Sequence, residues 1–255
     1  MFLDVAGQRL NVAAFGAGQQ TLLAISPWIF GWELWQCTLE LLSPTWRTVA
    51  YDHRGSGESP AAPETITLAA FLDDLFGVMD VLQIERCVLA TDSAASLIGF
   101  AAVLQQPERF AGLVTIGGIP TPLPAWPAFT AQYLADPAGV TKAFVAASVP
   151  GPQAAHLRCW LEHIGQRSDP AQAARFFAAL EHADVAPRLA EVRVPTLVIH
   201  GSADAIVPVS VAEMMTRQIP ESRLVALPEG DHGPVVSQPR EVAAAIQDYF
   251  LGSRH

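Results

Sequence analysis

Basic residues are scarce in this sequence. Lys and Arg number 15 against 25 Asp and Glu, which gives a formal net charge of −10, and the 255 residues contain no basic cluster. Such a chain repels polyanions, so we expect neither a nucleic acid nor a membrane as a partner. Charged residues make up 16% and hydrophobic residues 51% of the chain, which excludes a disordered protein and is ample for a large core.

Cysteines and long apolar runs are also few. Cys37, Cys87 and Cys159 lie far apart and form no CxxC or Cys/His pattern, so the sequence predicts reduced thiols and no metal site. Polar residues or prolines interrupt every apolar run, which predicts no membrane helix. The N-terminus lacks a basic region followed by an apolar one, so we expect no secretory signal and a cytoplasmic protein, monomeric or homodimeric.

Short β-rich runs alternate with longer helical runs along the chain. This pattern is typical of an α/β fold, and we expect a mostly parallel, eight-stranded twisted sheet with helices on both faces. The first two strands are expected to form an antiparallel hairpin around Gly7-Gln8. The expected strands are Phe2–Val5, Leu10–Phe15, Thr21–Ser26, Thr48–Asp52, Cys87–Thr91, Leu113–Ile116, Thr196–His200 and Arg223–Leu227. The expected helices are Leu34–Leu42, Leu68–Leu82, Ala94–Gln106, Val211–Gln218 and Arg240–Leu251.

The alternation breaks between about Pro120 and Leu189. This stretch begins with several prolines and continues as short Ala-rich helices, and the strand pattern resumes at Val194-Pro195. We interpret it as a helical cap inserted over the edge of the sheet where open α/β sheets bind ligands. The sequence therefore predicts a core in two parts, residues 1–119 and 191–255, and a cap over residues 120–190.

A candidate nucleophile lies where an expected strand turns sharply into a helix. Ser93 occupies the apex of this turn, with small residues expected two positions before and after it. Ala95 fits that requirement, whereas Thr91 is bulkier than the usual glycine. An ordinary helix cap at Ser93 is the competing interpretation. Asp92 is an alternative nucleophile, but the spacing to Pro107 favours Ser93.

Two further candidates follow later strands. Asp204 lies on the loop after a buried strand, a placement that suits an acid that orients a histidine, although a turn residue is the alternative. His232 lies between the last strand and the last helix, with glycines on both sides. We expect structural or surface roles for the other histidines, which are His53, His156, His163, His182, His200 and His255.

The chain order of the three candidates is Ser, Asp, His, and this order leads to a family. Tyr51–Ser59 resembles the D-x-R-G-x-G-x-S loop of the α/β-hydrolase superfamily, and Gln106–Phe110 is similar to its P-E-R-V/F turn. Val194–Asp204 and Gly230–His232 match its acid and histidine loops. The resemblance is to the capped, cofactor-free branch, and it implies a serine hydrolase with a catalytic triad and no cofactor.

The sequence departs from this family beside the proposed nucleophile. Ser26-Pro27-Trp28 stands where the family usually has His-Gly, so by analogy the N–H groups of Trp28 and Ala94 form the oxyanion hole. Asp92 stands where the family often has His or Gln. A carboxylate that pointed inward would disfavour an anionic intermediate, and capping of the following helix is the alternative.

The expected cap and the loop around Trp28 are rich in aromatic residues. Packing between cap and core accounts for most of them, and we expect a few to line an apolar pocket for a small-to-medium substrate. The candidate pocket residues are Trp28, Ile29, Trp126, Phe129, Tyr133, Trp160 and Val207.

The sequence thus predicts an enzyme that hydrolyses a carboxylic ester or lactone through Ser93, His232 and Asp204. The same fold and triad also fit a carbon–carbon bond hydrolase, a thioesterase, a perhydrolase-type enzyme or a cofactor-independent dioxygenase. A ligand-binding receptor with little turnover is the alternative outside enzymes, because the turn glycine and the His-Gly pair are missing. The sequence does not specify the substrate.

Overall fold

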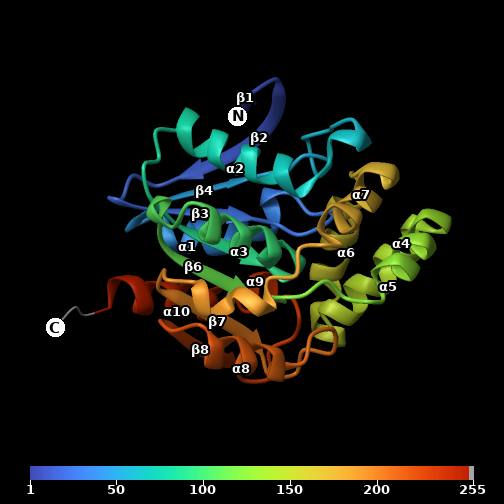
Figure 1. Cartoon of the computed structure of the whole chain (residues 1–255). Coiled ribbons are helices and arrows are strands. Elements are labelled where there is room, and N and C mark those ends of the chain that lie inside the picture. Colours follow the sequence, from blue (N-terminus) through green and yellow to red (C-terminus); the bar gives the residue numbers. More distant parts are fainter. Residues whose placement is uncertain (253–255) are drawn as a thin grey trace.

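An eight-stranded sheet lies at the centre of the computed structural model, which describes residues 1–252 (Figure 1). The strand order is β1-β2-β4-β3-β5-β6-β7-β8, and every neighbouring pair from β4 to β8 is parallel, whereas the pairs β1–β2 and β2–β4 are antiparallel. The predicted α/β fold class is confirmed. The strands are β1 (Phe2–Val5), β2 (Gln8–Phe15), β3 (Gln20–Ile25), β4 (Trp46–Tyr51), β5 (Cys87–Asp92), β6 (Phe110–Ile116), β7 (Thr196–Gly201) and β8 (Ser222–Leu227).

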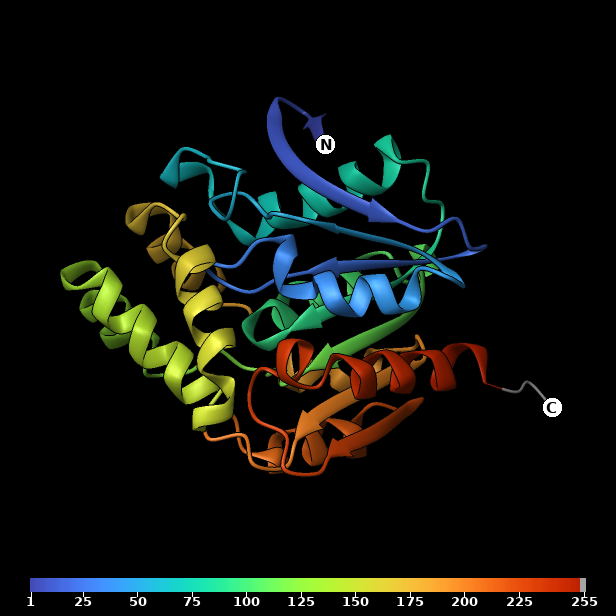
Figure 2. The same ribbon diagram turned by 180° about the vertical axis from the view of Figure 1, so that it is seen from behind.

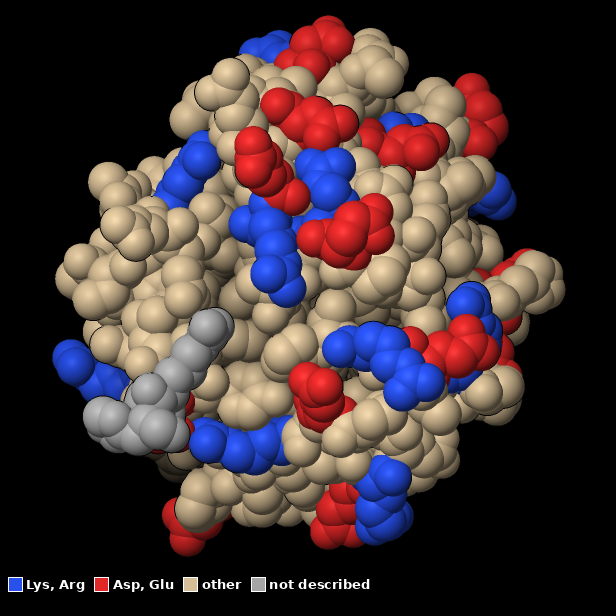
Figure 3. Space-filling model, turned by 60° about the vertical axis from the view of Figure 1, so that its left-hand side comes forward, with Lys and Arg blue, Asp and Glu red and all other residues tan. Residues whose placement is uncertain are grey.

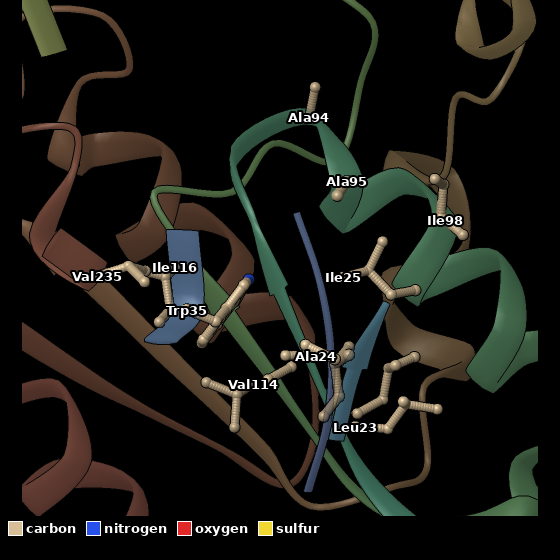
Figure 4. Packing of buried hydrophobic residues seen from close by; sticks show 14 of the residues in the cluster. Leu23, Ala24, Ile25, Trp35, Ala94, Ala95, Ile98, Val114, Ile116 and Val235 are labelled. Atoms are coloured by element: carbon tan, nitrogen blue, oxygen red, sulfur yellow. The ribbon is translucent and has the colours of Figure 1, made fainter. Parts of the chain in front are cut away.

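The central strands are apolar along their length because helices cover both of their faces. Every residue of β5 and β7 is buried, whereas the edge strand β8 is mostly half-exposed. Figure 4 shows this double packing, with Trp35 and Val235 on one side of the strands and Ile98 on the other. This continuous burial made the strands recognisable as near-uninterrupted apolar runs.

The first hairpin is antiparallel as predicted, but its turn lies one residue earlier. Val5 pairs with Gln8, so Gln8 already belongs to β2. The turn residues Ala6 and Gly7 have φ of 50° and 85°, the positive values that a two-residue turn needs to match the twist of the strands. The side chain of Asp4 accepts a hydrogen bond from the Gly7 N–H at 2.9 Å, which stabilises the turn.

The helices divide between the two faces of the sheet. Helices α2, α3 and α8 cover the face seen in Figure 1, and α1 and α10 lie side by side on the other face (Figure 2). Their bounds are α1 (Gln36–Leu42), α2 (Leu68–Val81), α3 (Ser96–Gln105), α8 (Val209–Gln218) and α10 (Pro239–Leu251), and the short helix α9 (Pro234–Ser237) was not predicted. Among the residues described, none of the helices is long and apolar enough for a membrane crossing.

Four further helices lie between β6 and β7 in the chain and form a layer beyond one edge of the sheet (Figure 2). They are α4 (Trp126–Ala135), α5 (Pro137–Ser148), α6 (Ala155–Gly165) and α7 (Pro170–Leu180). Proline begins α5 and α7, and Asp136 and Asp169 before these prolines accept backbone N–H bonds as caps. These helices fall within the predicted cap, residues 120–190. The boundaries between cap and core stay a prediction. Residues 253–255, at the end of the predicted core segment 191–255, lie outside the described residues.

The loop after β4, which carries the D-x-R-G-x-G-x-S pattern, fixes the cap to the core. Asp52 accepts hydrogen bonds from the N–H groups of Trp32 at 2.7 Å and Glu58 at 2.8 Å. Gly57, at φ 49°, leaves no room for a Cβ beside that carboxylate, and its N–H donates to the hydroxyl of Ser168, just before α7. The motif therefore builds a rigid loop on which the cap rests.

Candidate active site

The structure brings the three candidate residues together at the edge of the sheet where β5, β7 and β8 end. The Nε2 atom of His232 lies 3.0 Å from Oγ of Ser93, and its Nδ1 atom lies 2.8 Å from Oδ2 of Asp204. With neutral imidazole, Nδ1–H donates to the carboxylate and Nε2 accepts from the hydroxyl. This arrangement can move a proton from Ser93 to His232, which is what an activated serine nucleophile requires.

Ser93 stands on a strained turn directly after β5. Its φ is 49°, a left-handed value that costs a non-glycine residue about 1–3 kcal/mol. The turn is held by Ser96, whose hydroxyl donates to the carbonyl of Ser93 at 2.7 Å and accepts from the N–H of Ile119 at 2.9 Å. Ser93 rather than Asp92 is hydrogen-bonded to His232.

Thr91 fits into this turn because the next helix makes room for it. Thr91 is fully buried, and its hydroxyl donates to the carbonyl of Val114 at 3.2 Å. A Cβ added at Gly99 on α3 would lie only 2.7 Å from Cγ2 of Thr91. Gly99 on the facing helix thus leaves the space that the side chain of Thr91 needs, a compensation that only the three-dimensional packing reveals.

Asp204 is held as a carboxylate by several donors. Burial raises its pKa, but hydrogen bonds from His200 and His232 and from the N–H of Val207 outweigh burial and hold the pKa below its ordinary value. Its Oδ1 atom accepts from the N–H groups of Ile206 and Val207 at 2.8 and 2.9 Å. These bonds orient the carboxylate toward His232.

His200 is a neighbour of the triad that sequence analysis did not assign to the site. It is the residue before last of β7 and is fully buried, and its Nε2 atom lies 2.7 Å from the carbonyl of Val207 and 3.3 Å from Oδ2 of Asp204. Its position four residues before Asp204 was the one feature of the sequence that could have assigned it to the site. Of the other histidines, His255 lies outside the described residues.

His232 is buried, and its loop makes contacts with both the core and the cap. Burial lowers its pKa, but the hydrogen bond and charge of Asp204, helped by Asp92 and Asp231, raise the pKa above its ordinary value. The N–H of Gly233 donates to the carbonyl of Ser148 at the end of α5. The histidine loop is therefore attached to the cap as well as to the core.

Trp28 joins the loop after β3 to the cap. Its backbone has φ 52°, and its buried indole packs within 5.6 Å, between ring centroids, of four aromatic residues of the cap. These are Phe129, Tyr133, Phe144 and Phe177. The oxyanion role of the N–H groups of Trp28 and Ala94 stays a prediction, and both residues line the same cavity as Ser93.

That cavity has a volume of about 230 Å³ and walls that are apolar or aromatic apart from Ser93. It contains four of the predicted pocket residues, namely Trp28, Trp126, Phe129 and Val207. Its other lining residues are Pro27, Phe30, Ala94, Ile119, Leu123, Ala125, Phe144, Ala147, Phe177 and Ile206.

Three of the predicted pocket residues do not line this cavity, and the structure corrects their placement. Tyr133 packs edge-to-face against the Trp28 ring, with the two ring centroids 4.9 Å apart. Ile29 is fully buried and packs against Gly165 of α6. Trp160 is partly buried and packs on the hydrophobic core. All three belong to the hydrophobic core or pack against it, and none is among the residues that line the cavity.

Asp92 does not cap the helix that follows it. Its side chain makes no cap hydrogen bond, it is only 6% exposed, and it lines a second cavity together with Ser93 and His232. Burial raises the pKa of this carboxyl group to about 7, against the opposing effect of His232. Of the two alternatives for Asp92, capping of the following helix is therefore not the one that the structure shows.

Comparison with known proteins agrees with the fold described above. A family model described as alpha/beta hydrolase fold matches residues 20–171, and one described as TAP-like protein matches residues 177–254. Putative carbamate hydrolase RutD of Caulobacter sp. (strain K31) is 29% identical over 233 residues, which cover 86% of this chain and 85% of that protein.

Two further similarities span nearly the whole chain. Pimeloyl-acyl-carrier-protein methyl ester esterase of Aeromonas hydrophila is 26% identical over 261 residues, covering 95% of this chain and 99% of that protein. The crystal structure of a hydrolase from Pseudomonas aeruginosa PA01 has a TM-score of 0.90 at 27% identity and covers 99% of this chain and 98% of its own.

Proposed function

The chain belongs to the alpha/beta hydrolase fold family and is a hydrolase of that type, and from this premise we propose that it hydrolyses a carboxylic ester or lactone of a small-to-medium apolar acid. The observation that carries the proposal is the hydrogen-bonded series Ser93–His232–Asp204, which opens into an apolar cavity. A nucleophile activated in this way attacks carbonyl carbon, and an apolar wall favours a neutral acyl group.

Acylation proceeds through successive steps that use the groups around Ser93. Its Oγ attacks the carbonyl carbon and gives its proton to Nε2 of His232, while Asp204 stabilises the imidazolium that forms. The N–H groups of Trp28 and Ala94 stabilise the negative charge on the carbonyl oxygen. His232 then protonates the leaving alkoxide, and the acyl group remains on Ser93.

Deacylation repeats these steps with water. Water gives a proton to His232 as its oxygen attacks the acyl carbon, and the bond to Ser93 breaks. His232 returns the proton to Oγ of Ser93, and the carboxylic acid leaves.

Size, polarity and charge support a neutral substrate. The cavity of about 230 Å³ lies below the ~300–1,000 Å³ that is typical of sites for drug-sized ligands. The net charge of −10 disfavours an anionic substrate. Figure 3 shows one face of the molecule, on which acidic and basic side chains are interspersed. The names of the two curated relatives, a putative carbamate hydrolase and a methyl ester esterase, also favour hydrolysis at a carbonyl group.

A panel of p-nitrophenyl esters, from acetate to octanoate, tests the proposal together with a negatively charged succinate half-ester. We expect turnover of the neutral short and medium esters, little turnover of the succinate half-ester, and a loss of about 10⁴-fold or more in kcat in Ser93→Ala. Turnover that survives this substitution, or a preference for the charged ester, would contradict the proposal.

A further inference from the structure

A second, smaller cavity lies beside Ser93. It has a volume of about 30 Å³ and shares Pro27, Phe30, Ser93 and Phe144 with the main cavity. A space of at least ~10–15 Å³ is enough for one water molecule, provided that polar partners surround it. The small cavity differs from the main one in having such partners, because Asp92, Ser148 and His232 line it.

Asp92 provides an unused hydrogen-bond acceptor in this cavity. The residue is 6% exposed, and its Oδ1 atom has no hydrogen-bond partner among residues 1–252. A buried polar atom without a partner costs about 1–3 kcal/mol, so such an atom in a folded protein calls for an explanation. The charged groups that act on Asp92 are His232 and Asp204, and neither is hydrogen-bonded to it.

Ser148 offers a second acceptor in the same space. This residue ends α5 and is 6% exposed, and its hydroxyl donates to the carbonyl of Phe144 at 2.8 Å. Its oxygen therefore keeps lone pairs that can accept a hydrogen bond. The two acceptors come from the core and from the cap, so the cavity is complete only when the cap is in place.

The two cavities suit the two reactants of deacylation, which are the acyl group on Ser93 and the attacking water. The main cavity contains Trp28 and Ala94, the proposed oxyanion donors, and it accommodates the acyl group. The attacking water must lie within hydrogen-bonding reach of Nε2 of His232, which is the base that takes its proton. His232 lines the small cavity and is not among the residues that line the main one.

We propose that the small cavity holds the water molecule that hydrolyses the acyl-enzyme, with Asp92 as the residue that positions it and Ser148 as a second contact. This inference rests on the proposed ester hydrolysis. One proton of the water passes to Nε2 of His232, while its other O–H bond is directed at Asp92. The water oxygen bonds to the acyl carbon, the bond to Oγ of Ser93 breaks, and His232 returns the proton to Oγ.

An electrostatic role of Asp92 predicts a different pattern. Its charge helps to raise the pKa of His232, and His232 acts as base in both acylation and deacylation. A change in the basicity of His232 therefore alters both half-reactions, whereas loss of the water site slows deacylation alone. Asp231 provides a matched control, because its charge also raises the pKa of His232 but it does not line the small cavity.

The test uses p-nitrophenyl acetate with wild type, Asp92→Leu, Asp92→Asn, Ser148→Ala and Asp231→Asn. Stopped-flow release of p-nitrophenol gives the acylation rate, and acid quench followed by mass spectrometry gives the fraction of enzyme acetylated at Ser93. For Asp92→Leu we expect an acylation rate within about threefold of wild type, a deacylation rate lower by about tenfold or more, and a larger acetylated fraction.

The other variants extend the test should Asp92→Leu fold poorly. Asp92→Asn keeps an acceptor oxygen and should restore most of the deacylation rate, whereas Ser148→Ala should slow deacylation to a smaller extent than Asp92→Leu. Asp231→Asn should change both rates by the same factor. Equal losses of both rates in the Asp92 and Ser148 variants, or an unchanged deacylation rate, would overturn the water site. A wild type that is never acetylated at Ser93 would instead overturn the proposed function itself.

Discussion

Replacing Trp28 by alanine perturbs both the packing between cap and core and the geometry of the proposed oxyanion hole. The indole is 2% exposed, and its ring centroid lies between 4.9 and 5.6 Å from those of four cap aromatics. The N–H of the same residue is a proposed oxyanion donor. The substitution therefore removes the side chain that holds this donor in position.

The expected magnitudes follow from burial and from donor geometry. Replacing a buried tryptophan by alanine costs about 3–5 kcal/mol, out of a total free energy of unfolding of about 5–15 kcal/mol for a typical domain. Displacing one oxyanion donor lowers kcat by about 10²–10³-fold. We expect Trp28→Ala to show both effects in protein that is still folded at low temperature.

The backbone conformation at this position reverses the usual difference in stability between a glycine and an alanine variant. Trp28 has φ 52°, a value that glycine adopts without cost and that costs an L-residue about 1–2 kcal/mol. Trp28→Gly should therefore be more stable than Trp28→Ala by about 1 kcal/mol, the reverse of the usual order at buried positions in regular structure.

Urea unfolding and ester kinetics measure the two effects, with Trp46→Ala as the control. Trp46 is also fully buried, but it begins β4 at the opposite edge of the sheet from Ser93. The variant Trp46→Ala should lose about as much stability as Trp28→Ala and keep the kcat of the wild type. The reasoning is refuted if both variants lose the same activity, or if Trp28→Ala is destabilised and yet keeps kcat within about threefold.

The remaining predictions concern the acid, the base and the loop below the cap. Asp204→Asn should lower kcat by about 10⁴-fold without unfolding the protein, because the imidazole loses the acceptor that fixes its tautomer; a loss below about tenfold would argue against its role. Because the pKa of His232 is raised and only the neutral imidazole accepts a proton, kcat/KM should rise with pH through a midpoint above the ordinary 6.5; a midpoint below this value would contradict the geometry. Arg54→Ala should cost about 3–5 kcal/mol in urea unfolding, because it leaves the buried carboxylate of Asp74 unpaired. Arg217→Ala, at an exposed ion pair, should cost less than about 1 kcal/mol. Equal losses of stability in Arg54→Ala and Arg217→Ala would contradict the expected difference between the buried and the exposed ion pair.

The sequence was sufficient for the sheet and for the proximity of the three candidate residues. Parallel strands end at one edge, so a serine, an acid and a histidine that each follow a strand must come close together. Buried strands are also distinct in sequence, because both of their faces are apolar. The hairpin turn was misplaced by one residue, because Ala6 rarely has a positive φ and gives no signal comparable to Gly7.

The details of the pocket could not be predicted, because they depend on which face each cap helix presents. Trp126 and Phe129 on α4 line the cavity, whereas Tyr133 on the same helix packs against Trp28 without lining the cavity. Composition alone does not separate these positions. The pairing of Thr91 with Gly99 is likewise a contact between two elements, and nothing in either segment alone indicates it.

The most direct test of the account is the identity of the residue that becomes acylated. Wild-type protein is mixed with p-nitrophenyl butyrate, quenched in acid within the first turnover, digested and analysed by mass spectrometry. We expect a butyryl group on the peptide that contains Ser93, and in Ser93→Ala we expect both the absence of this group and the loss of turnover. A butyryl group on another residue, or full turnover by Ser93→Ala, would contradict it.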